Sequence, residues 1–448
     1  MKNKAWISFR RWNAVATAAS RLPASAGRIS ASLSFLIVAS VIGSTTACDA
    51  DAADFQIVSG QYITLKSDIS DRDQLTDWVT AFDSAVPQWC KFLGVPVTRL
   101  SDWKIDAFVM RDRNRFIESR DLPIEVRMRF GYAIHGNIWV MNQKGSYYTR
   151  HLLLHEGVHA LILELYGVLG PPWYAEGLAE TLGVHRMSAT GLEVGGVPAS
   201  NEVVPYWGRF PLVRKAREQS KVPTLQRLFD LKADWKGDVE SYAWAWIAFM
   251  LLTEYESYRP ATIAATEDLT LTRDRFMQRF QSRLADAWPV VQARWRLLAN
   301  TIDYGFDWER ERCKLSKRDP LWNGQGFTYQ VDSSLGWQSC GVRFAPGQTV
   351  RLKASGECSM NPDPQPWLSQ PPGVTIRYVN GRPLGQLLYC ILPNATRETE
   401  WLEPLPIASL EANETLKINQ HCWLLFRIND AASEMGDNEG GYQVTIKE

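Results

Sequence analysis

The stretch that decides the fold reads HEGVH, from His155 to His159, inside a mostly apolar run that extends from Tyr148 to Tyr166. The spacing of apolar residues in this run predicts a helix. Two histidines four residues apart then lie one turn apart on the same helix face, where both can bind one metal ion. Glu156 projects beside them and is the candidate general base. A metal site is favoured over a surface histidine pair, because unliganded histidines in an apolar helix would carry a desolvation cost.

A second stretch, WYAEGLAE from Trp173 to Glu180, follows the helix-ending residues Gly170-Pro171-Pro172. The short connection lets the two helices run antiparallel, so Glu176 can bring a carboxylate oxygen to the open side of the metal and complete a His2Glu set. Zinc in such a set keeps one position for water and lowers the pKa of that water to about 7. Glu180 lies one turn further on, either as an acceptor for a ligand imidazole N–H or as a solvated carboxylate.

The two stretches together resemble the gluzincin metallopeptidases, specifically the peptidase MA-like group, over roughly residues 54–310. The resemblance implies an α+β zincin-like metallopeptidase domain with zinc as cofactor. It implies Glu176 as the third zinc ligand beside the two histidines. It also implies that Tyr242 donates its hydroxyl to the oxyanion formed during hydrolysis, where the alternative is a buried core aromatic.

The predicted strand from Gly136 to Met141 precedes the metal helix, as the substrate-lining edge strand of that family does. An extended peptide or protein substrate would add to its edge as a further strand. No G-x-M-E-N segment precedes the metal helix, so aminopeptidase activity is not supported. His151 is a third histidine of the helix, but it lies about 12 Å from His159 and cannot share an ion with it. We expect it at the helix start or against substrate.

The N-terminus has the features of an export signal. Basic residues precede an apolar run from Leu33 to Gly43, which is too short to span a bilayer as a helix. Thr45 to Cys48 resembles a bacterial lipobox, which would make Cys48 a lipid anchor. The alternative is cleavage at Ala50-Asp51-Ala52 and release of a soluble protein. We expect residues 1–52 to be leader, and the mature protein to be periplasmic, membrane-anchored or extracellular.

The charge balance names no partner, and we expect none among nucleic acids. Lys+Arg and Asp+Glu both number 49 in the 448 residues, so no net field favours nucleic acid. Apolar residues make up 45% of the chain, which is ordinary for a globular protein.

Cysteine usage fits export. Seven cysteines become six once Cys48 is lipidated or removed, and an even number suggests disulfides in an oxidising compartment. We expect Cys340 to pair with Cys358 across neighbouring strands; free buried thiols are the alternative.

The pattern of predicted helices and strands changes along the chain. Residues 53–312 alternate predicted strands with many helices, and residues 327–448 are short strand-like runs broken by Gly, Pro, Asn and Asp. Residues 313–326 are the predicted linker. The elements expected in the first part are strands at 55–66, 103–110 and 136–141, and helices at 71–92, 148–166, 173–182, 224–231, 242–255, 271–284 and 288–300.

The C-terminal part resembles the β-sandwich of the calcium-dependent galactose lectin PA-IL, on GWQSCG at 336–341, IND at 428–430 and DNEGGY at 437–442. The resemblance implies an all-β sandwich and a calcium site that bridges to carbohydrate. Asp430, Asp437 and Asn438 are the matching ligands, and hard oxygen ligands suit calcium. Glu434 stands where the lectin pattern has Thr. The alternative is that 437–441 forms a polar hairpin turn.

These features predict an exported, endopeptidase-type zinc metallopeptidase that hydrolyses peptide bonds with Glu156 as general base. The competing prediction is a non-catalytic or glycan-binding surface protein that retains a zincin scaffold. A third is zinc hydrolysis of a non-peptide amide in the cell wall.

Overall fold

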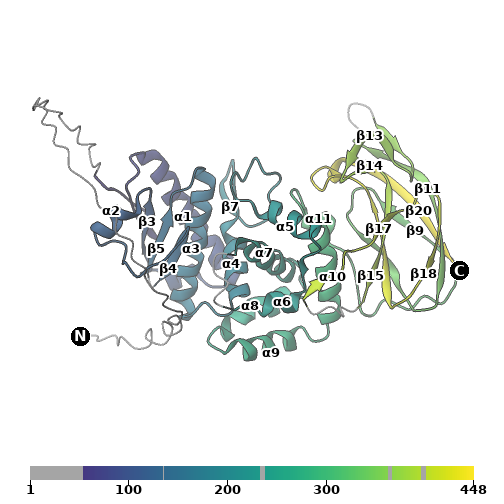
Figure 1. Cartoon of the computed structure of the whole chain (residues 1–448), viewed down its shortest axis with the longest axis horizontal. Coiled ribbons are helices and arrows are strands. Elements are labelled where there is room, and N and C mark those ends of the chain that lie inside the picture. The colour runs from purple at the N-terminus through teal and green to yellow at the C-terminus, as the bar shows by residue number, and fades with distance from the viewer. Residues whose placement is uncertain (1–53, 135, 233–237, 362–365, 395–399) are drawn as a thin grey trace, which may run out of the picture. The chain divides into compact units, whose positions relative to one another are not determined.

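The N-terminal half of the chain is organised around one mixed sheet. The structure, a computed structural model, describes residues 54–134, 136–232, 238–361, 366–394 and 400–448. The sheet has the strand order β1-β2-β3-β5-β4, in which β2, β3 and β5 are parallel and the outer strands are antiparallel (Figure 1). Its strands are β1 (Gln56–Ser59), β2 (Ile63–Ser67), β3 (Ile105–Met110), β4 (Gly131–Ile134) and β5 (Asn137–Met141).

The edge of this sheet differs from the prediction. The strand expected to be the edge is β5, which is paired on both sides, by β3 and by β4. The chain reverses at Gly136, whose φ of 80° favours glycine, and β4 takes the edge position. The expected single strand at 55–66 is also a hairpin, because Gly60 donates its N–H to Ile63 and turns the chain between β1 and β2.

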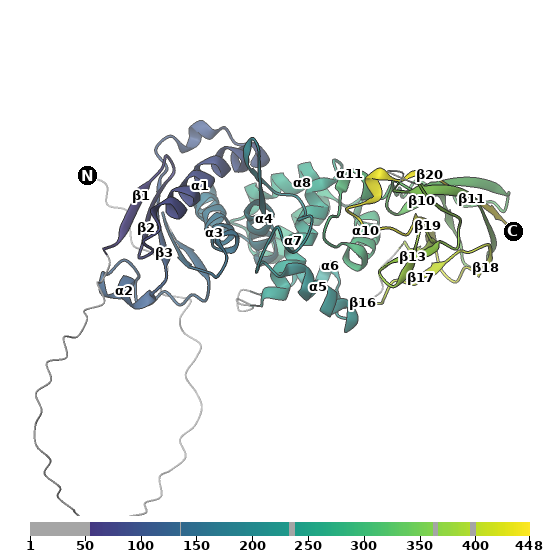
Figure 2. The same ribbon diagram turned by 90° about the horizontal axis from the view of Figure 1, so that it is seen from above.

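Two long helices pack on one face of the sheet. Both views place α1 (Arg72–Leu93) and α3 (Ser146–Tyr166) side by side there (Figures 1 and 2). Helix α3 ends at Gly167, which has a φ of 78°, and α4 (Pro172–Gly183) begins five residues later. Helix α7 (Val239–Glu254) packs closely against α4. Helices α3, α4 and α7 carry the predicted residues of the candidate site, and α1 packs against α3.

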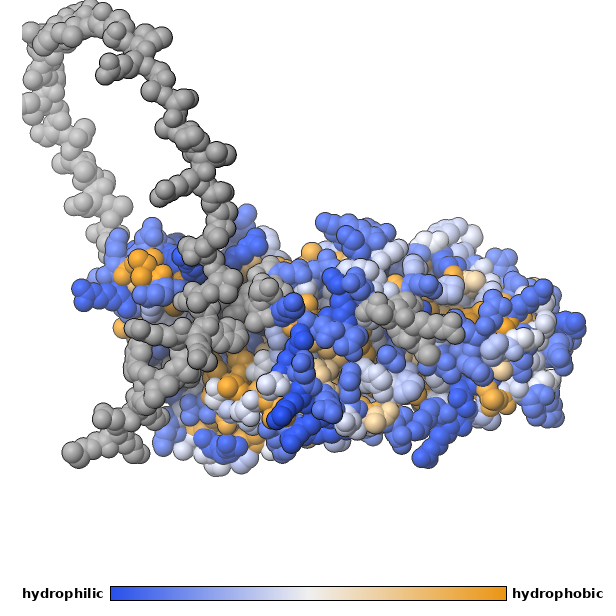
Figure 3. Space-filling view, turned by 60° about the horizontal axis from the view of Figure 1, so that its bottom comes forward, coloured by the Kyte–Doolittle hydropathy of each residue, from blue (hydrophilic) through white to orange (hydrophobic). Residues whose placement is uncertain are grey.

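The rest of the first part is mainly helical, as the sequence predicts. It contains α2 (Arg113–Glu118), α5 (Arg209–Glu218), α6 (Leu225–Phe229), α8 (Arg259–Ala264), α9 (Arg273–Arg283), α10 (Trp288–Thr301), α11 (Trp308–Glu311), the hairpin β6 (His185–Ser188) with β7 (Gly191–Val194), and β8 (Val222–Pro223). No helix in the described ranges has the length and apolarity needed to cross a membrane. The face drawn in Figure 3 is mostly hydrophilic, with apolar residues in scattered groups.

The C-terminal part is β-rich and consists of two main sheets around a shared apolar cluster. One sheet has the order β10-β19-β15-β17, and the other has β12-β11-β20-β9 with β18 also paired to β11. The strands are β9 (Phe327–Asp332), β10 (Gln338–Phe344), β11 (Thr349–Met360), β12 (Trp367–Ser369), β13 (Val374–Val379), β14 (Arg382–Leu384), β15 (Leu387–Pro393), β16 (Trp401–Leu402), β17 (Ile407–Ser409), β18 (Asn413–Lys417), β19 (Cys422–Ile428) and β20 (Glu439–Lys447).

The first of these sheets is buried on both faces. On β19, Leu424 and Phe426 lie in the cluster between the two sheets, while Trp423 and Leu425 lie in a second cluster with Leu297 of α10. Strands covered on both faces read as continuous apolar runs rather than as alternating ones. This explains the sequences LLYCILP of β15 and CWLLFRI of β19.

The expected linker takes part in this packing. Cys313 and Leu315 belong to the cluster that includes α10, and Trp322 belongs to the cluster between the sheets. Strand β16 also pairs with β8, which comes from the first part of the chain. The residues from 54 onward accordingly fall into one compact unit.

A buried ion pair joins α11 to β19. The guanidinium of Arg427 donates to both carboxylate oxygens of Glu311, at 2.8 and 3.0 Å, and both side chains are buried. Gly336 makes room for this pair, because a Cβ at that position would overlap the Glu311 carboxylate.

The expected disulfide between Cys340 and Cys358 is wrong. Cys340 lies on β10 and Cys358 on β11, which belong to different sheets, so the two cysteines are not on neighbouring strands. All six cysteines in the described residues are free and buried. Burial raises the pKa of the Cys340 thiol to about 12, which keeps it protonated and unreactive.

Removing one partner of the buried pair should destabilise the fold strongly. Glu311→Gln leaves the Arg427 guanidinium buried without a counter-charge, and we expect the free energy of unfolding to fall by roughly 3–5 kcal/mol. Arg214→Gln is the matched control, because the Arg214–Asp303 pair is partly exposed and should contribute about 1 kcal/mol or less. Urea denaturation measures both. Equal losses in the two variants would contradict a stabilising role for the buried pair.

Candidate metal centre

Helix α3 presents three polar side chains from a buried setting. His155, Glu156 and His159 are 5%, 8% and 6% exposed, in a helix whose neighbouring residues are almost all apolar core. Gly157 lies between them and faces α1, where a Cβ would overlap the ring of Phe82. The small residue inside HEGVH therefore lets α1 pack directly against the helix that carries the site.

Helix α4 is anchored by its aromatic residues. Trp173 and Tyr174 are fully buried, and the Tyr174 hydroxyl donates to the backbone carbonyl of Thr262 at 2.8 Å. Gly177 allows the close approach of α7, because a Cβ there would lie 2.7 Å from the Ala245 carbonyl oxygen. These contacts fix the position of α4 and direct Glu176 toward the histidines of α3.

The donor atoms of the predicted set converge. Oε2 of Glu176 lies 3.1 Å from Nε2 of His155 and 3.3 Å from Nε2 of His159, and the two Nε2 atoms are 3.2 Å apart. Donor atoms about 2.0–2.1 Å from a shared ion at tetrahedral angles would lie roughly 3.3–3.4 Å apart. The three side chains therefore fit a tetrahedral metal ion with one position left open, and they form a buried group that could hold one.

Without metal, His155 holds its proton strongly and Glu176 is ionised. Burial alone would raise the pKa of Glu176, but the His159 and His155 imidazoles outweigh it and lower that pKa to about 2. Burial alone would lower the pKa of His155, but the Glu176 and Glu180 carboxylates raise it to about 10. A proton on His155 thus supplies, between the two carboxylates, the positive charge that a metal ion would supply when bound.

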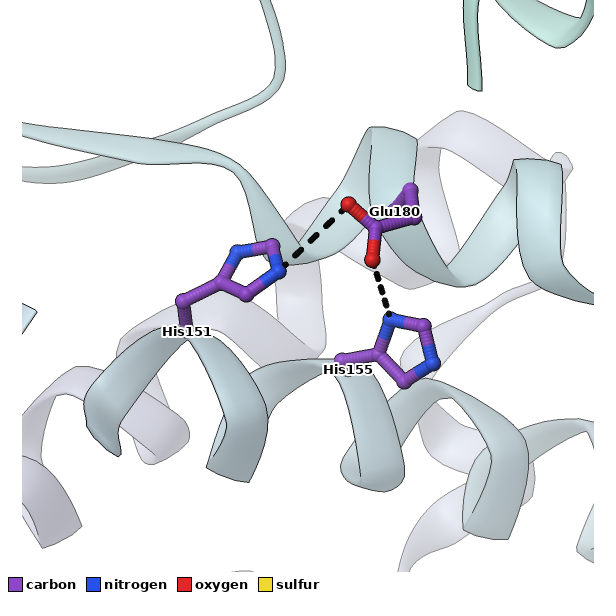
Figure 4. Close-up of side chains that lie close together, drawn as sticks. All are labelled: His151, His155 and Glu180. Atoms are coloured by element: carbon purple, nitrogen blue, oxygen red, sulfur yellow. Dashed lines mark ion pairs between the residues drawn. The ribbon is translucent and has the colours of Figure 1, made fainter. Parts of the chain in front are cut away.

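Glu180 lies behind the donor set, where the sequence places it. One carboxylate oxygen is 3.4 Å from Nδ1 of His155, and the other is 3.5 Å from Nε2 of His151 (Figure 4). The guanidinium of Arg209 donates to both oxygens, at 2.7 and 3.1 Å. Burial alone would raise the pKa of Glu180, but Arg209 holds it well below its usual value. Glu180 is therefore a buried carboxylate ion and not a solvated one.

His151, His155 and Glu180 form a second group of buried donors, which is the group drawn in Figure 4. The ion pair with Arg209 already satisfies both oxygens of this carboxylate and neutralises its charge. A cation there would have to displace or repel the guanidinium. The set of His155, His159 and Glu176 is the better metal site, because no arginine is bonded to its carboxylate in the described contacts.

The expected contact of His151 with substrate is wrong, and the residue lies in the second turn of α3, which begins at Ser146. Its side chain is fully buried and packs between the rings of Tyr148 and Trp207, so it does not contact substrate. Burial lowers its pKa and favours the neutral imidazole.

A glycine of the edge strand leaves room for the Glu156 carboxylate. Gly131 of β4 lies so close to the Glu156 carboxylate that a Cβ at 131 would overlap Oε1. The same strand, the donor set and Tyr242 line one cleft of about 530 Å³. Burial, followed by the charges of Glu176 and Glu156, raises the pKa of Tyr242, so its hydroxyl remains a hydrogen-bond donor. The cleft thus gathers the three predicted metal ligands with Glu156, Glu180 and Tyr242.

Two residues of the site could not be predicted. Arg209 begins α5 directly after Gly208, far from either motif in sequence, and no spacing rule links it to Glu180. Gly131 belongs to a short strand that the sequence analysis did not expect. The sequence feature that could have indicated Gly131 is a glycine shortly before the metal helix, and such a glycine by itself is not specific.

The C-terminal candidates come together only in part. Asp430 accepts from Nδ2 of Asn438 at 2.9 Å and from the backbone N–H of Ala431, and its pKa is raised by burial. Oδ1 of Asn438 is buried without a partner among the described residues. Asp437 is exposed, and no described side-chain contact joins it to the other two. Glu434 pairs with Arg377.

Comparisons with known proteins add little. No known family model matches this chain, and no curated protein matches it. A solved structure described as "EclA N-terminal domain; PllA-like lectin" is similar at 17% sequence identity and a TM-score of 0.21, covering 27% of this chain and 94% of that chain. A likeness of this size carries no argument about function.

Metal binding should release a proton. The pKa of His155 is about 10 in the metal-free site, so near pH 7 a metal must displace its extra proton, whereas Glu176 is already ionised. Affinity should therefore rise with pH, by up to tenfold per unit, and level off above about pH 10. Calorimetric titration with zinc in two buffers of different ionisation enthalpy counts the protons. A buffer-independent heat at pH 7 would contradict the raised pKa.

Proposed function

We propose that this protein is a zinc-dependent peptidase with a zincin-like catalytic domain. The observation that carries the proposal is the convergence of Nε2 of His155, Nε2 of His159 and Oε2 of Glu176 within 3.1–3.3 Å, in a cleft that also contains Glu156. Two imidazoles and one carboxylate are the donor set of catalytic zinc sites that keep one position open.

The chain would supply three further roles. Zinc, when bound, polarises the scissile carbonyl and lowers the pKa of a water to about 7. Glu156 accepts the proton of that water and delivers it to the leaving amine. The Tyr242 hydroxyl, protonated because burial raises its pKa, donates to the oxyanion that develops on the substrate carbonyl. Glu180 fixes the orientation of the His155 ring from the opposite side.

The substrate would bind along β4. Among the described strands, β4 pairs only with β5, so its outer edge offers backbone groups to an extended peptide. Gly131 at one end of the strand lies against Glu156, which brings a peptide on this edge next to the general base. Pairing along a strand edge engages several consecutive residues of an extended chain, which favours endopeptidase action.

Export remains part of the proposal. Residues 1–52, the lipobox with its anchor site Cys48 and the alternative cleavage site at Ala52 lie outside the described residues. We propose that the leader directs the protein to the periplasm, a membrane anchor or the exterior. Burial of the free thiols is compatible with an oxidising compartment, because a buried thiol with a raised pKa reacts slowly.

Glu156→Gln should retain zinc and lose peptidase activity. The variant keeps all three donor side chains but removes the proton acceptor, so we expect kcat for peptide cleavage to fall by roughly 10²–10⁴-fold. Metal analysis of the purified protein and cleavage of a quenched-fluorescence peptide library measure the two properties.

Glu176→Gln serves as the comparison, since it removes a charged donor and should lower zinc content itself. If Glu156→Gln cleaves peptides as fast as the wild type, the proposed mechanism is wrong. If the wild type binds zinc and cleaves no peptide, the non-catalytic alternative is supported, and amide substrates of the cell wall become the next assay.

A second candidate is calcium-dependent carbohydrate binding by the C-terminal part. The observation that favours it is that Oδ1 of Asn438 is buried without a hydrogen-bond partner among the described residues, on a side chain whose Nδ2 donates to the Asp430 carboxylate. Amide and carboxylate oxygens are ligands that suit a hard cation. Millimolar calcium should then raise Tm by a few degrees in the wild type and not in Asn438→Ala. Magnesium is the control ion. An unchanged Tm would favour the alternative in which 437–441 is a polar turn.

A further inference from the structure

The cleft is lined by two arginines that the proposed chemistry does not use. Arg127 and Arg129 are exposed side chains of the segment that leads into β4, and both line the cleft that contains the donor set. The other charged residues of the cleft wall are His155, His159, Glu156, Glu176, Glu180 and Arg209.

Two of the three inner carboxylates of the cleft are already paired. Glu176 is bonded to the two histidines, and Glu180 is paired with Arg209. Neither Arg127 nor Arg129 takes part in any ion pair found among the described residues. The outer part of the cleft therefore carries positive charge that is available to a ligand.

The segment that carries the arginines is held at both ends. The guanidinium of Arg113 donates to the Val126 carbonyl at 2.6 Å, and Met141 donates its N–H to the Phe130 carbonyl at 2.7 Å. The Arg129 guanidinium also lies 5.0 Å from the centre of the Phe130 ring. The two arginines thus keep a defined position next to Gly131, which touches Glu156.

We propose that Arg127 and Arg129 select substrates that carry carboxylates on one side of the scissile bond. This inference rests on the proposed peptidase function. Arg129 and Arg127 precede Gly131 by two and four residues, and the chain bends at 129 and 130 before β4 begins, so both line the cleft beyond the end of the strand that touches Glu156. The selected carboxylate accordingly lies within a few residues of the bond. Arginine binds carboxylates through two parallel hydrogen bonds, whether they belong to Asp, Glu or a chain terminus.

The test compares matched peptides that differ in one position. Each set places Glu, Gln or Lys two, three or four residues to either side of the scissile bond, with the C-terminus free or amidated. We expect wild-type kcat/KM to be roughly 3- to 10-fold higher for Glu than for Gln on one side only, and the preference to shrink with added salt. If only the free C-terminus raises kcat/KM, the carboxylate that the arginines bind is that of the chain terminus.

Variants assign the preference to these residues. Arg127→Gln/Arg129→Gln should bring the Glu/Gln ratio close to one. Arg99→Gln/Arg275→Gln removes the same charge from exposed positions outside the cleft and should leave the ratio as in the wild type. A wild-type enzyme without preference for carboxylates, or an unchanged ratio in Arg127→Gln/Arg129→Gln, overturns the inference.

A binding measurement separates this inference from the proposed function. Fluorescence anisotropy with labelled Glu and Gln peptides on the Glu156→Gln protein reports selection without turnover. Preferred binding of Glu peptides that disappears in Arg127→Gln/Arg129→Gln supports the inference even if no peptide is cleaved, which would overturn only the peptidase proposal. Cleavage without selection overturns only the inference.

Discussion

The structure depends on neutralising a group of charges that lies inside the protein. Glu176 and Glu180 flank the His155 ring from opposite sides, and Arg209 pairs with the second of these carboxylates. A buried ion is tolerated only where counter-charges and hydrogen bonds replace its hydration. Helices α3, α4 and α5 must therefore meet in one arrangement, and the glycines of the motifs permit the contacts. Gly157 admits α1, and the glycine of the second motif admits α7.

The sequence predicts the elements whose signals are local. Apolar spacing and the helix-ending Gly and Pro residues locate α3 and α4 to within two residues, and motif spacing identifies the three donors. It could not predict features that depend on tertiary pairing. The edge strand β4 is four residues long and is defined by its partner β5, and Arg209 meets Glu180 only in the folded chain. Cys340 and Cys358 are close in sequence, but the chain crosses between two sheets in that interval.

The junction between the first part and the β-rich part shows the same limit. Short strands and turn residues predict the second part well, but its sheet β10-β19-β15-β17 is covered by α10 on the face that a free sandwich would expose to water. The apolar runs of β15 and β19 indicate that both faces of the sheet are covered, because strands of a sheet with one face in water would alternate apolar and polar residues. The buried pair of Glu311 and Arg427 adds a charge contact across the same junction. The β-rich part is thus built as a portion of a larger core.

The outer edge of β4, unpaired among the described strands, has a consequence for the substrate recognition that we propose. Pairing along an edge strand requires several consecutive residues of the partner to be extended and to have unused backbone hydrogen bonds. Helices and interior strands of a folded protein do not meet that requirement, whereas unfolded segments and loose termini do. Under the proposed peptidase function, the edge next to Gly131 would bring only a chain in that state to Glu156. The conformation of the substrate segment would then decide which proteins are cut, before any of its side chains is recognised. Such selection is expected of an enzyme that acts on damaged or unassembled proteins.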